Sequence, residues 1–366
     1  MRICIDARFM GAEATRGIGR YVGELVRAML EVAPENRYVL VTRSASHPFA
    51  PHPSVETIVA DVPWYGFTEQ IRLPAVFASA KADLVHVPHW NVPLFLRGPF
   101  VVTVHDLLLR HEPASAKVST RGFFLRTLKR LGYRLVLWNA LRRARRILVP
   151  TQFVARDVME FYPFARGKII VTGEGMPPFP PSSSRMRGPT DYLLYVGSAY
   201  PHKGLGDLME AWEMVSKAHP GLELRIAGEM DAFMEAVRSD AERRKLPRVT
   251  FLGTVDDATL RTLYGSALAF VFPSHFEGFG LPPLEALAEG CPVVCSDAAS
   301  LPEVLGPDGA IFFRAGDPDA ILQAIEQVVR EPEVFRRNAA TAAKRLSVIH
   351  DWRNAALHTL IAYQNQ

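Results

Sequence analysis

Short apolar runs alternate with amphipathic stretches from the start of the chain. Apolar runs at 2–6, 38–42, 84–87, 100–104 and 146–149 predict buried strands, and the spacing of apolar residues over 19–32 predicts a long helix. Strands that alternate with helices in this way are typical of a doubly wound parallel sheet with helices on both faces. We therefore expect an α/β domain in the first half of the chain.

The same alternation restarts after residue 190. Strands are expected at 192–196, 223–227, 249–252, 267–272 and 292–295, and helices at 205–216, 257–264, 317–329 and 333–346. Between the two halves, residues 173–189 are rich in Pro, Gly and Ser, as interdomain linkers are. The predicted organisation is a domain at 1–172, a linker at 173–189, a second domain at 190–345 and a terminal helical segment at 346–366.

Length and composition agree with two soluble α/β domains. The chain has 366 residues, too many for one small core. No apolar run reaches the roughly 20 residues that span a bilayer, and residues 1–6 form a polar-ended strand rather than a signal peptide. We expect a cytoplasmic protein, at most peripheral on the inner face of the cell membrane. Cys4, Cys291 and Cys295 lack metal-like spacing and are expected to be reduced core thiols.

Charge is distributed unevenly along the chain. Residues 1–189 hold 26 Lys and Arg against 14 Asp and Glu, a balance of +12, whereas residues 190–345 hold 15 against 23, a balance of −8. The segment Lys117–Arg146 contains no acidic residue and mixes basic with apolar side chains. It is either a solvated helix face on its own core or an attachment site for anionic lipid headgroups. Nucleic acid is not expected as a partner, because no nucleic-acid module is present and the second half is acidic.

The segment 273–292 carries the most informative motif. Glu277 and Glu285 lie eight residues apart across a Gly-rich bend, directly after the apolar run 267–272. Gly278 and Gly280 can turn backbone N–H groups toward a ligand, and the prolines that follow suit the first turn of a helix. A helix N-terminus binds phosphate, and two carboxylates can accept hydrogen bonds from hydroxyls, so a sugar nucleotide fits both features. For Glu285 alone, the simpler interpretation is a first-turn Glu that the helix dipole favours.

Three further segments place polar residues after predicted strands. Gly17-Ile-Gly19-Arg20-Tyr21 opens the long first helix, but the loop before it is long and no acidic residue follows the next strand, which excludes a nicotinamide dinucleotide fingerprint. His105 and Asp106 end the run 100–104, where burial demands a partner or a function. Lys203 follows the strand 192–196, although on its own it would pass for an ordinary exposed lysine.

Together these segments resemble the retaining glycosyltransferases of the GT-B fold, family four, in the expected order and over nearly the whole chain. The resemblance implies two Rossmann-like doubly wound domains that face each other across a cleft. It places His105 in a catalytic role, with Asp106 in support, and assigns Lys203 to the departing diphosphate and Glu277 to the donor sugar. The donor-binding residues it implies are Gly17, Gly19, Arg20, Gly197, Ser198, His202, Lys203, Gly228, Leu252, Val255, Glu277, Gly278, Phe279, Gly280, Leu281 and Glu285, the last toward the ribose.

The sequence departs from the family pattern at one place. His202 stands where the family usually has Arg, and residues 197–199 supply no other cation. Lys203 and backbone amides would then have to stabilise the leaving group, or Arg8, Arg16 or Arg20 would assist from the first domain. No Asp-x-Asp metal motif appears at a strand end, since Asp256-Asp257 suits a helix start, and no metal or other cofactor is expected.

These features predict a retaining, metal-independent glycosyltransferase that uses a nucleoside diphosphate sugar. Gly-Ile-Gly-Arg-Tyr with Thr-Val-His-Asp-Leu looks most like the mannosyltransferases of bacterial surface polysaccharide synthesis, which implies GDP-mannose as donor and a glycan or lipid-linked acceptor. A UDP-sugar donor, another GT-B enzyme such as a sugar-nucleotide epimerase, and a non-catalytic peripheral nucleotide-binding membrane protein are the alternatives.

Overall fold

The computed structural model describes residues 1–10, 17–111, 123–177 and 191–364, without the side chains of 123–130. Contacts divide the chain into two compact units. The first unit comprises Met1–Leu107, Val118–Gly175 and His350–Gln366, and the second comprises Leu108–Lys117 and Met176–Ile349. The chain therefore passes from the first unit to the second twice, after Leu107 and after Gly175, and returns at Val118 and at His350.

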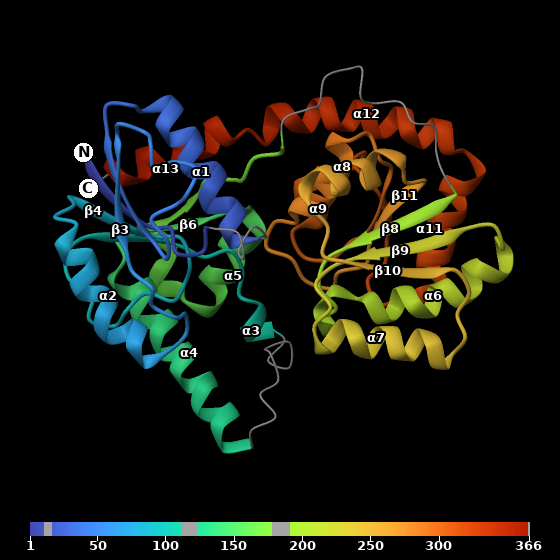
Figure 1. Ribbon diagram of the computed structural model, residues 1–366, viewed down its shortest axis with the longest axis horizontal. Helices are drawn as coiled ribbons and strands as arrows, with labels where there is room; N and C mark the ends of the chain where they lie inside the picture. The colour runs from blue at the N-terminus through green and yellow to red at the C-terminus, as the bar shows by residue number, and fades with distance from the viewer. Residues whose placement is uncertain (11–16, 112–122, 178–190, 365–366) are drawn as a thin grey trace. The chain divides into compact units, whose positions relative to one another are not determined.

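The first unit is built on one parallel sheet with the order β3-β2-β1-β4-β5-β6-β7 (Figure 1). Its strands are β1 (Arg2–Asp6), β2 (Arg37–Thr42), β3 (Val55–Val59), β4 (Leu84–Val87), β5 (Phe100–Thr103), β6 (Arg146–Val149) and β7 (Ile169–Val171). Its helices are α1 (Ile18–Val32), α2 (Phe67–Ser79), α4 (Phe123–Arg143), α5 (Gln152–Phe161) and α13 (Trp352–Gln364), with a 3-10 turn at Pro163–Lys168. The strand order reverses between β1 and β4, and such a switch point is where open α/β sheets bind ligands.

Two apolar layers cover the first sheet. On one face α1 and α13 pack on the sheet around Ile3, Leu25 and Tyr363. On the other face α2, α4 and α5 pack around Phe77, Leu137 and Val158. The helices are amphipathic because their apolar residues recur at the helical period, and each buries one face on the sheet.

The second unit repeats this plan with the sheet order β10-β9-β8-β11-β12-β13, again parallel throughout (Figure 1). Its strands are β8 (Tyr192–Val196), β9 (Glu223–Ala227), β10 (Val249–Gly253), β11 (Ala269–Phe272), β12 (Val293–Ser296) and β13 (Ile311–Phe313). Its helices are α3 (Leu108–His111), α6 (Leu205–Ala218), α7 (Ala232–Arg243), α8 (Asp257–Ser266), α9 (Leu281–Ala288), α10 (Leu301–Leu305), α11 (Pro318–Arg330) and α12 (Pro332–Ile349). The switch point lies between β8 and β11.

Figure 1 shows α8, α9 and α12 on one face of the second sheet and α6 and α7 on the other. Trp212 of α6 is fully buried in the apolar layer on one face of the sheet, and Leu284 of α9 is fully buried in the layer on the other face. The prediction of two doubly wound parallel sheets is confirmed.

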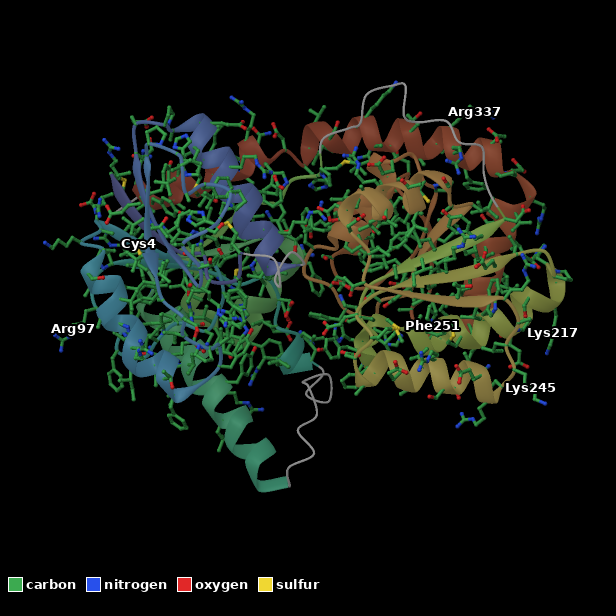
Figure 2. All side chains as sticks on the ribbon, viewed as in Figure 1. Cys4, Arg97, Lys217, Lys245, Phe251 and Arg337 are labelled. Carbon is green, nitrogen blue, oxygen red and sulfur yellow. The ribbon has the colours of Figure 1, made fainter. Side chains whose placement is uncertain are left out.

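The three cysteines lie in these cores. Cys4, Cys291 and Cys295 are buried and are free thiols, and Figure 2 shows Cys4 inside the first unit. Burial raises the pKa of Cys4 and of Cys291 to about 12, which keeps both as neutral thiols. None of the helices in the described part of the chain combines the length and the apolar character needed to cross a bilayer.

Candidate active site

A lysine and a glutamate from the two central strands of the second sheet form an ion pair. Lys203 follows β8 in a single 3-10 turn, Pro201–Lys203, and Glu277 follows β11. The Lys203 Nζ atom lies 2.7 Å from the Glu277 Oε1 atom. Both side chains remain partly open to solvent, at 22% and 13% exposure. The switch point of this sheet thus holds an ammonium group and a carboxylate that a ligand can reach.

Gly204 fixes the loop that carries Lys203. Its φ of +65° lies in the left-handed region, where a side chain is strained. A Cβ atom at this position would lie 2.0 Å from the carbonyl oxygen of Pro273, so the two loops are in backbone contact. The His275 N–H also donates to the His202 carbonyl oxygen at 2.7 Å. The Lys203–Glu277 pair is therefore set by the backbone as well as by its own charges.

The Gly-rich bend leads directly into α9. Gly280 has φ of +92°, and the hydroxyl of Ser300 donates to the Glu277 carbonyl oxygen at 2.9 Å, which fixes the bend from the β12–α10 side. Glu285 lies beyond the first turn of α9 and accepts a hydrogen bond from the Tyr264 hydroxyl at 3.4 Å. The interpretation of Glu285 as a first-turn residue favoured by the helix dipole is therefore wrong.

His202 is buried beside this pair but carries no charge at neutral pH. Burial, followed by the charge of Lys203, lowers the pKa of His202 to about 4. Its ring stacks on Tyr200, with centroids 6.0 Å apart. Its Nδ1 atom is buried without a hydrogen-bond partner among the residues that the structure describes. A neutral imidazole cannot replace the positive charge of an arginine.

The neighbouring strand ends are joined through their backbones. The Gly197 N–H donates to the Ala227 carbonyl oxygen at 3.0 Å, and the Gly228 N–H donates to the Gly253 carbonyl oxygen at 2.9 Å. A Cβ atom at Gly228 would lie 2.1 Å from the Gly197 carbonyl oxygen. Glycine at 228 is therefore required for the ends of β8, β9 and β10 to approach this closely.

In the first unit, a histidine–carboxylate pair lies at the carboxyl ends of the strands. His105 follows β5, and its Nδ1 atom lies 3.2 Å from the Oε1 atom of Glu174, which follows β7. The other ring nitrogen, Nε2, lies 3.1 Å from the carbonyl oxygen of Pro88, after β4. Burial lowers the pKa of His105, but the hydrogen bond and charge of Glu174, with smaller contributions from Pro88 and Asp106, together raise it above its ordinary value.

Aromatic and polar groups surround His105. The ring of Tyr21, on α1, meets it edge-on with centroids 4.6 Å apart. The Tyr21 hydroxyl contacts the Thr103 hydroxyl at 3.3 Å, and that hydroxyl contacts the Nε2 atom of His86 at 2.8 Å. The other nitrogen of His86 contacts the Tyr363 hydroxyl of α13 at 2.7 Å. A buried chain of hydrogen bonds thus connects α13 with the residues that pack on His105.

The two halves of the chain match two related family models. Residues 15–177 match Glycosyltransferase Family 4, and residues 181–346 match Glycosyl transferases group 1. The chain is a family 4 glycosyltransferase.

Characterised relatives span most of this glycosyltransferase. It is 29% identical to the O-antigen chain mannosyltransferase B of Escherichia coli over 305 residues, which cover 78% of this chain and 74% of the relative. It is 26% identical to the O-antigen chain mannosyltransferase RfbU of Salmonella typhimurium, with 75% and 72% coverage. It is 29% identical to a glycogen synthase of Mycobacterium tuberculosis, with 78% and 69% coverage.

Solved structures show that the glycosyltransferase has the GT-B fold. Sucrose-phosphate synthase from Thermosynechococcus elongatus superposes with a TM-score of 0.79 at 20% identity, over 99% of this chain and 98% of that one. WaaG, a glycosyltransferase involved in lipopolysaccharide biosynthesis, superposes with a TM-score of 0.76 at 15% identity, over 100% and 99% of the two chains.

The structure brings the predicted site residues together in two groups. In the second unit, Lys203, Glu277 and the glycines of both loops lie at one sheet edge, and Leu252 and Val255 flank the end of the edge strand β10. In the first unit of the glycosyltransferase, His105 and the start of α1 lie at the carboxyl edge of the sheet. Gly17 is the residue before α1, with φ of +59°, and Gly19 and Arg20 lie in its first turn.

Sequence reasoning missed several contacts of this site. Glu174 falls in the segment that composition marks as a linker, yet its side chain is 5% exposed and pairs with His105. The sequence offered one sign that Glu174 belongs to the site: it is a charged residue between two glycines shortly after a strand. The hypothesis that Arg8 helps to stabilise the leaving group is wrong. Its buried guanidinium already donates hydrogen bonds to Asp6 at 2.8 Å and to Glu69 at 2.7 Å. Arg16, another candidate, lies outside the described residues.

The acidic groups that the structure describes are the candidate ligands for a metal site. Within residues 1–10, 17–111, 123–177 and 191–364, no cluster of three or more His, Cys, Asp or Glu side chains is arranged to hold a metal ion. Asp256 is the residue before α8 and accepts a hydrogen bond from the Thr259 N–H at 2.7 Å. This hydrogen bond gives Asp256 the role of a helix cap, as its position in the sequence predicted.

Proposed function

We propose that this glycosyltransferase transfers mannose from GDP-mannose, with retention of configuration and without a metal ion, to a hydroxyl of a glycan or lipid-linked acceptor in bacterial surface polysaccharide synthesis. Two of its relatives are named as O-antigen chain mannosyltransferases, and family members use nucleotide-sugar donors. The observation that carries the proposal is the Lys203–Glu277 ion pair beside the Gly-rich bend before α9.

This pair matches the two chemical parts of a nucleotide sugar. A diphosphate competes for the Lys203 ammonium group, which then stabilises the charge that develops on the leaving group. Once Lys203 has moved from Glu277 to the diphosphate, the Glu277 carboxylate can accept hydrogen bonds from sugar hydroxyls. Backbone N–H groups at the start of α9 add a favourable dipole for phosphate. Gly278, Phe279, Gly280 and Leu281 are the proposed donor contacts on this bend, with Glu285 toward the ribose.

We assign the remaining predicted residues to supporting roles. His105 acts beside the reacting sugar, and Asp106 supports it. Gly17, Gly19 and Arg20 contact the diphosphate from α1, while Gly197, Ser198 and Gly228 give the donor close access to the backbone at the ends of β8 and β9. His202 contributes as a neutral packing group, because its lowered pKa removes the charge that a phosphate contact would need.

Binding of nucleotide sugars tests the donor. GDP-mannose should raise the melting temperature of the enzyme by mass action, by more than UDP-, ADP- or CMP-sugars at equal concentration. Glu277→Gln should weaken the effect of GDP-mannose more than that of GDP, because the carboxylate is assigned to the sugar. A shift with UDP- or ADP-sugars alone would refute GDP-mannose, and the glycogen synthase relative makes those donors the second candidate. Mannose transfer to a saccharide acceptor is then measured directly.

We further propose that α4 attaches the enzyme to anionic lipid on the inner face of the cell membrane. Its described side chains include exposed Leu131, Leu135 and Trp138, at 55%, 55% and 42% exposure. Leu131 and Leu135 lie one helical turn apart, and Arg142 lies over the Trp138 ring at 5.3 Å. Apolar side chains next to basic ones favour an interfacial position on a charged membrane. Of the basic segment Lys117–Arg146, residues 117–122 and the side chains of 123–130 lie outside the described part.

Vesicle sedimentation tests this attachment. The enzyme should sediment with phosphatidylglycerol vesicles at low salt, and replacing Leu131, Leu135 and Trp138 together with Ser should reduce the bound fraction severalfold. Val348→Ser is the matched control, because Val348 is an exposed apolar residue (75%) on α12. Equal binding to neutral phosphatidylcholine vesicles, or no loss in the triple variant, would contradict the proposal.

A further inference from the structure

While Glu174 is ionised, both ring nitrogens of His105 face oxygen atoms that can only accept hydrogen bonds. Nδ1 lies 3.2 Å from a carboxylate oxygen of Glu174, and Nε2 lies 3.1 Å from the carbonyl oxygen of Pro88. A neutral imidazole carries one N–H, so one of its nitrogens would present a lone pair to an oxygen lone pair. Only the imidazolium form, with two N–H groups, satisfies both contacts.

We propose that Glu174 is a positioning residue that keeps His105 in the imidazolium form, so that His105 serves glycosyl transfer as a fixed positive charge rather than as a base. That His105 is an imidazolium follows from its contacts with Glu174 and Pro88 and does not depend on the proposed function. The part about transfer rests on the function proposed above. Arg8 does not supply this positive charge, because its guanidinium is paired with Asp6 and Glu69.

The surrounding groups favour this assignment. Asp106, the next residue, adds negative charge that raises the pKa of His105 further. The two other histidines nearby, His86 and His89, remain neutral, because burial first and then the charge of His105 lower the pKa of each to about 3. Among these three described histidines, the pKa is raised for His105, which contacts a carboxylate, and lowered for His86 and His89.

The uncharged neighbours of His105 leave the Glu174 contact intact. The rings of Tyr21 and His105 are nearly perpendicular, and burial raises the pKa of the Tyr21 hydroxyl, so the hydroxyl stays neutral. Arg8 acts on this cluster through His89, whose pKa it lowers by its charge. Glu174 is the acidic group in hydrogen-bond contact with His105, so its substitution should have the largest effect on the His105 pKa.

The position of Glu174 is fixed by the packing of the next residue. A Cβ atom at Gly175 would lie 2.2 Å from the Cγ atom of Trp352, the first residue of α13, so glycine is needed for this approach. The Trp352 ring also lies 6.0 Å from the Tyr21 ring. The backbone of Thr172, two residues before Glu174, donates to the Val149 carbonyl oxygen at 3.0 Å. Glu174 thus reaches His105 from a segment that is held on both sides.

An imidazolium has consequences for the transfer step. The acceptor oxygen forms a bond to the anomeric carbon while the bond from that carbon to the phosphate oxygen breaks, and the acceptor hydroxyl must release its proton. His105 has no free electron pair to take it. The departing phosphate oxygen, which gains negative charge as its bond to carbon breaks, is then the group that receives the proton, and the charge of His105 stabilises the negative charge that develops.

The protonation state can be measured without any substrate. In enzyme labelled with ¹⁵N-histidine, the His105 ring signals are assigned from their loss in His105→Gln and followed through a pH titration. We expect imidazolium shifts at both nitrogens at pH 7.5, above the ordinary pKa of about 6.5. In Glu174→Gln, which keeps the size but removes the charge, His105 should titrate at least one pH unit lower. A neutral His105 at pH 7, or an unchanged titration in Glu174→Gln, would overturn the inference.

The pH profile of kcat/KM provides the second readout. The alkaline limb should follow the deprotonation of His105 and should move to lower pH in Glu174→Gln, which gives about a tenfold rate loss at pH 8 for each unit of movement. Glu160→Gln is the control, because it makes the same change at an exposed site on α5. A uniform loss at all pH values, with the limb unmoved, would mean a merely structural role. Absence of transfer from every donor would refute the proposed function while leaving the ¹⁵N titration valid.

Discussion

His105 and His202 lie in similar places, but their pKa values are shifted in opposite directions. Each follows a buried strand of a parallel sheet, at the carboxyl edge where ligands bind. His105 has the Glu174 carboxylate at 3.2 Å, and its pKa is raised. His202 lies next to Lys203, and its pKa is lowered to about 4 by burial and then by the Lys203 charge.

The pKa of a site histidine is therefore decided by its neighbours and not by its place in a motif. Each unit places a basic side chain against a carboxylate after its strands, His105 with Glu174 in the first and Lys203 with Glu277 in the second. In the second unit the charge resides on the lysine, and the adjacent histidine is neutral. Lys203 in the second unit and His105 in the first are therefore two groups through which we propose that positive charge acts on a diphosphate donor.

The largest expected effect is that of removing the cation of the second unit. Lys203→Ala should lower kcat/KM by about 10²–10³-fold, the range for loss of one group that stabilises transition-state charge. Lys217→Ala is the control, because Lys217 is an exposed lysine near the end of α6 that points away from the sheet (Figure 2). The measurement is steady-state mannose transfer. A loss below tenfold in Lys203→Ala would show that the second unit does not depend on this charge.

Removing the cation of the first unit should have the next largest effect. His105→Gln replaces the imidazolium with a neutral group of similar reach, and kcat/KM should fall by about 10–10²-fold at pH 7 because one positive charge is lost. The loss should shrink as the pH is raised, because the wild-type enzyme then loses the same charge. A loss that is equal at pH 7 and pH 9 would contradict a role for the charge of His105.

The third prediction concerns Gly204, which fixes the loop that carries Lys203. Gly204→Ala should lower the free energy of unfolding by about 1–2 kcal/mol, because φ of +65° is strained for alanine and its Cβ would meet the Pro273 carbonyl oxygen. Denaturant unfolding measures the change. Gly206→Ala, on α6 with no atom within 4 Å of the new Cβ, should instead stabilise by about 0.5–1 kcal/mol. Similar effects of both substitutions would show that the loop is not fixed at Gly204.

Sequence patterns predicted the central strands of both sheets but missed their less regular parts. The strands β1, β4, β8 and β11 are fully or largely buried, so their apolar runs are plain. The edge strand β3, with half-exposed and exposed positions only, has no such run, and the helix that follows it was missed as well. Edge strands bury less surface, so their sequences carry a weaker pattern.

The same distinction applies to the site. Lys203 and Glu277 were predicted because each follows a strand within a short motif. Glu174 contacts His105 across 69 positions of the chain, a distance over which local patterns carry no information. The pKa shifts of His105 and His202 could not be predicted from the sequence either. Each depends on burial and on neighbours that only the folded chain provides.

The smallest expected effect is that of His202→Gln. Because His202 is neutral at pH 7, a neutral side chain of similar polarity should keep kcat/KM within about threefold of wild type. A loss as large as that of His105→Gln would erase the difference between the two histidines. Tyr200→Leu, which removes the ring that stacks on His202, is a control for the packing contribution.

The pH dependence of stability sharpens the same prediction. The pKa of His202 is about 4 when folded, against about 6.5 when unfolded, so between these values the unfolded chain binds more protons. His202 therefore makes the folded state lose stability as the pH falls from about 6.5 toward 4, and His202→Gln removes that loss. Denaturant unfolding should show the variant gaining stability relative to wild type between pH 7 and pH 5. Parallel stability curves over this range would mean that His202 does not lose its proton on folding.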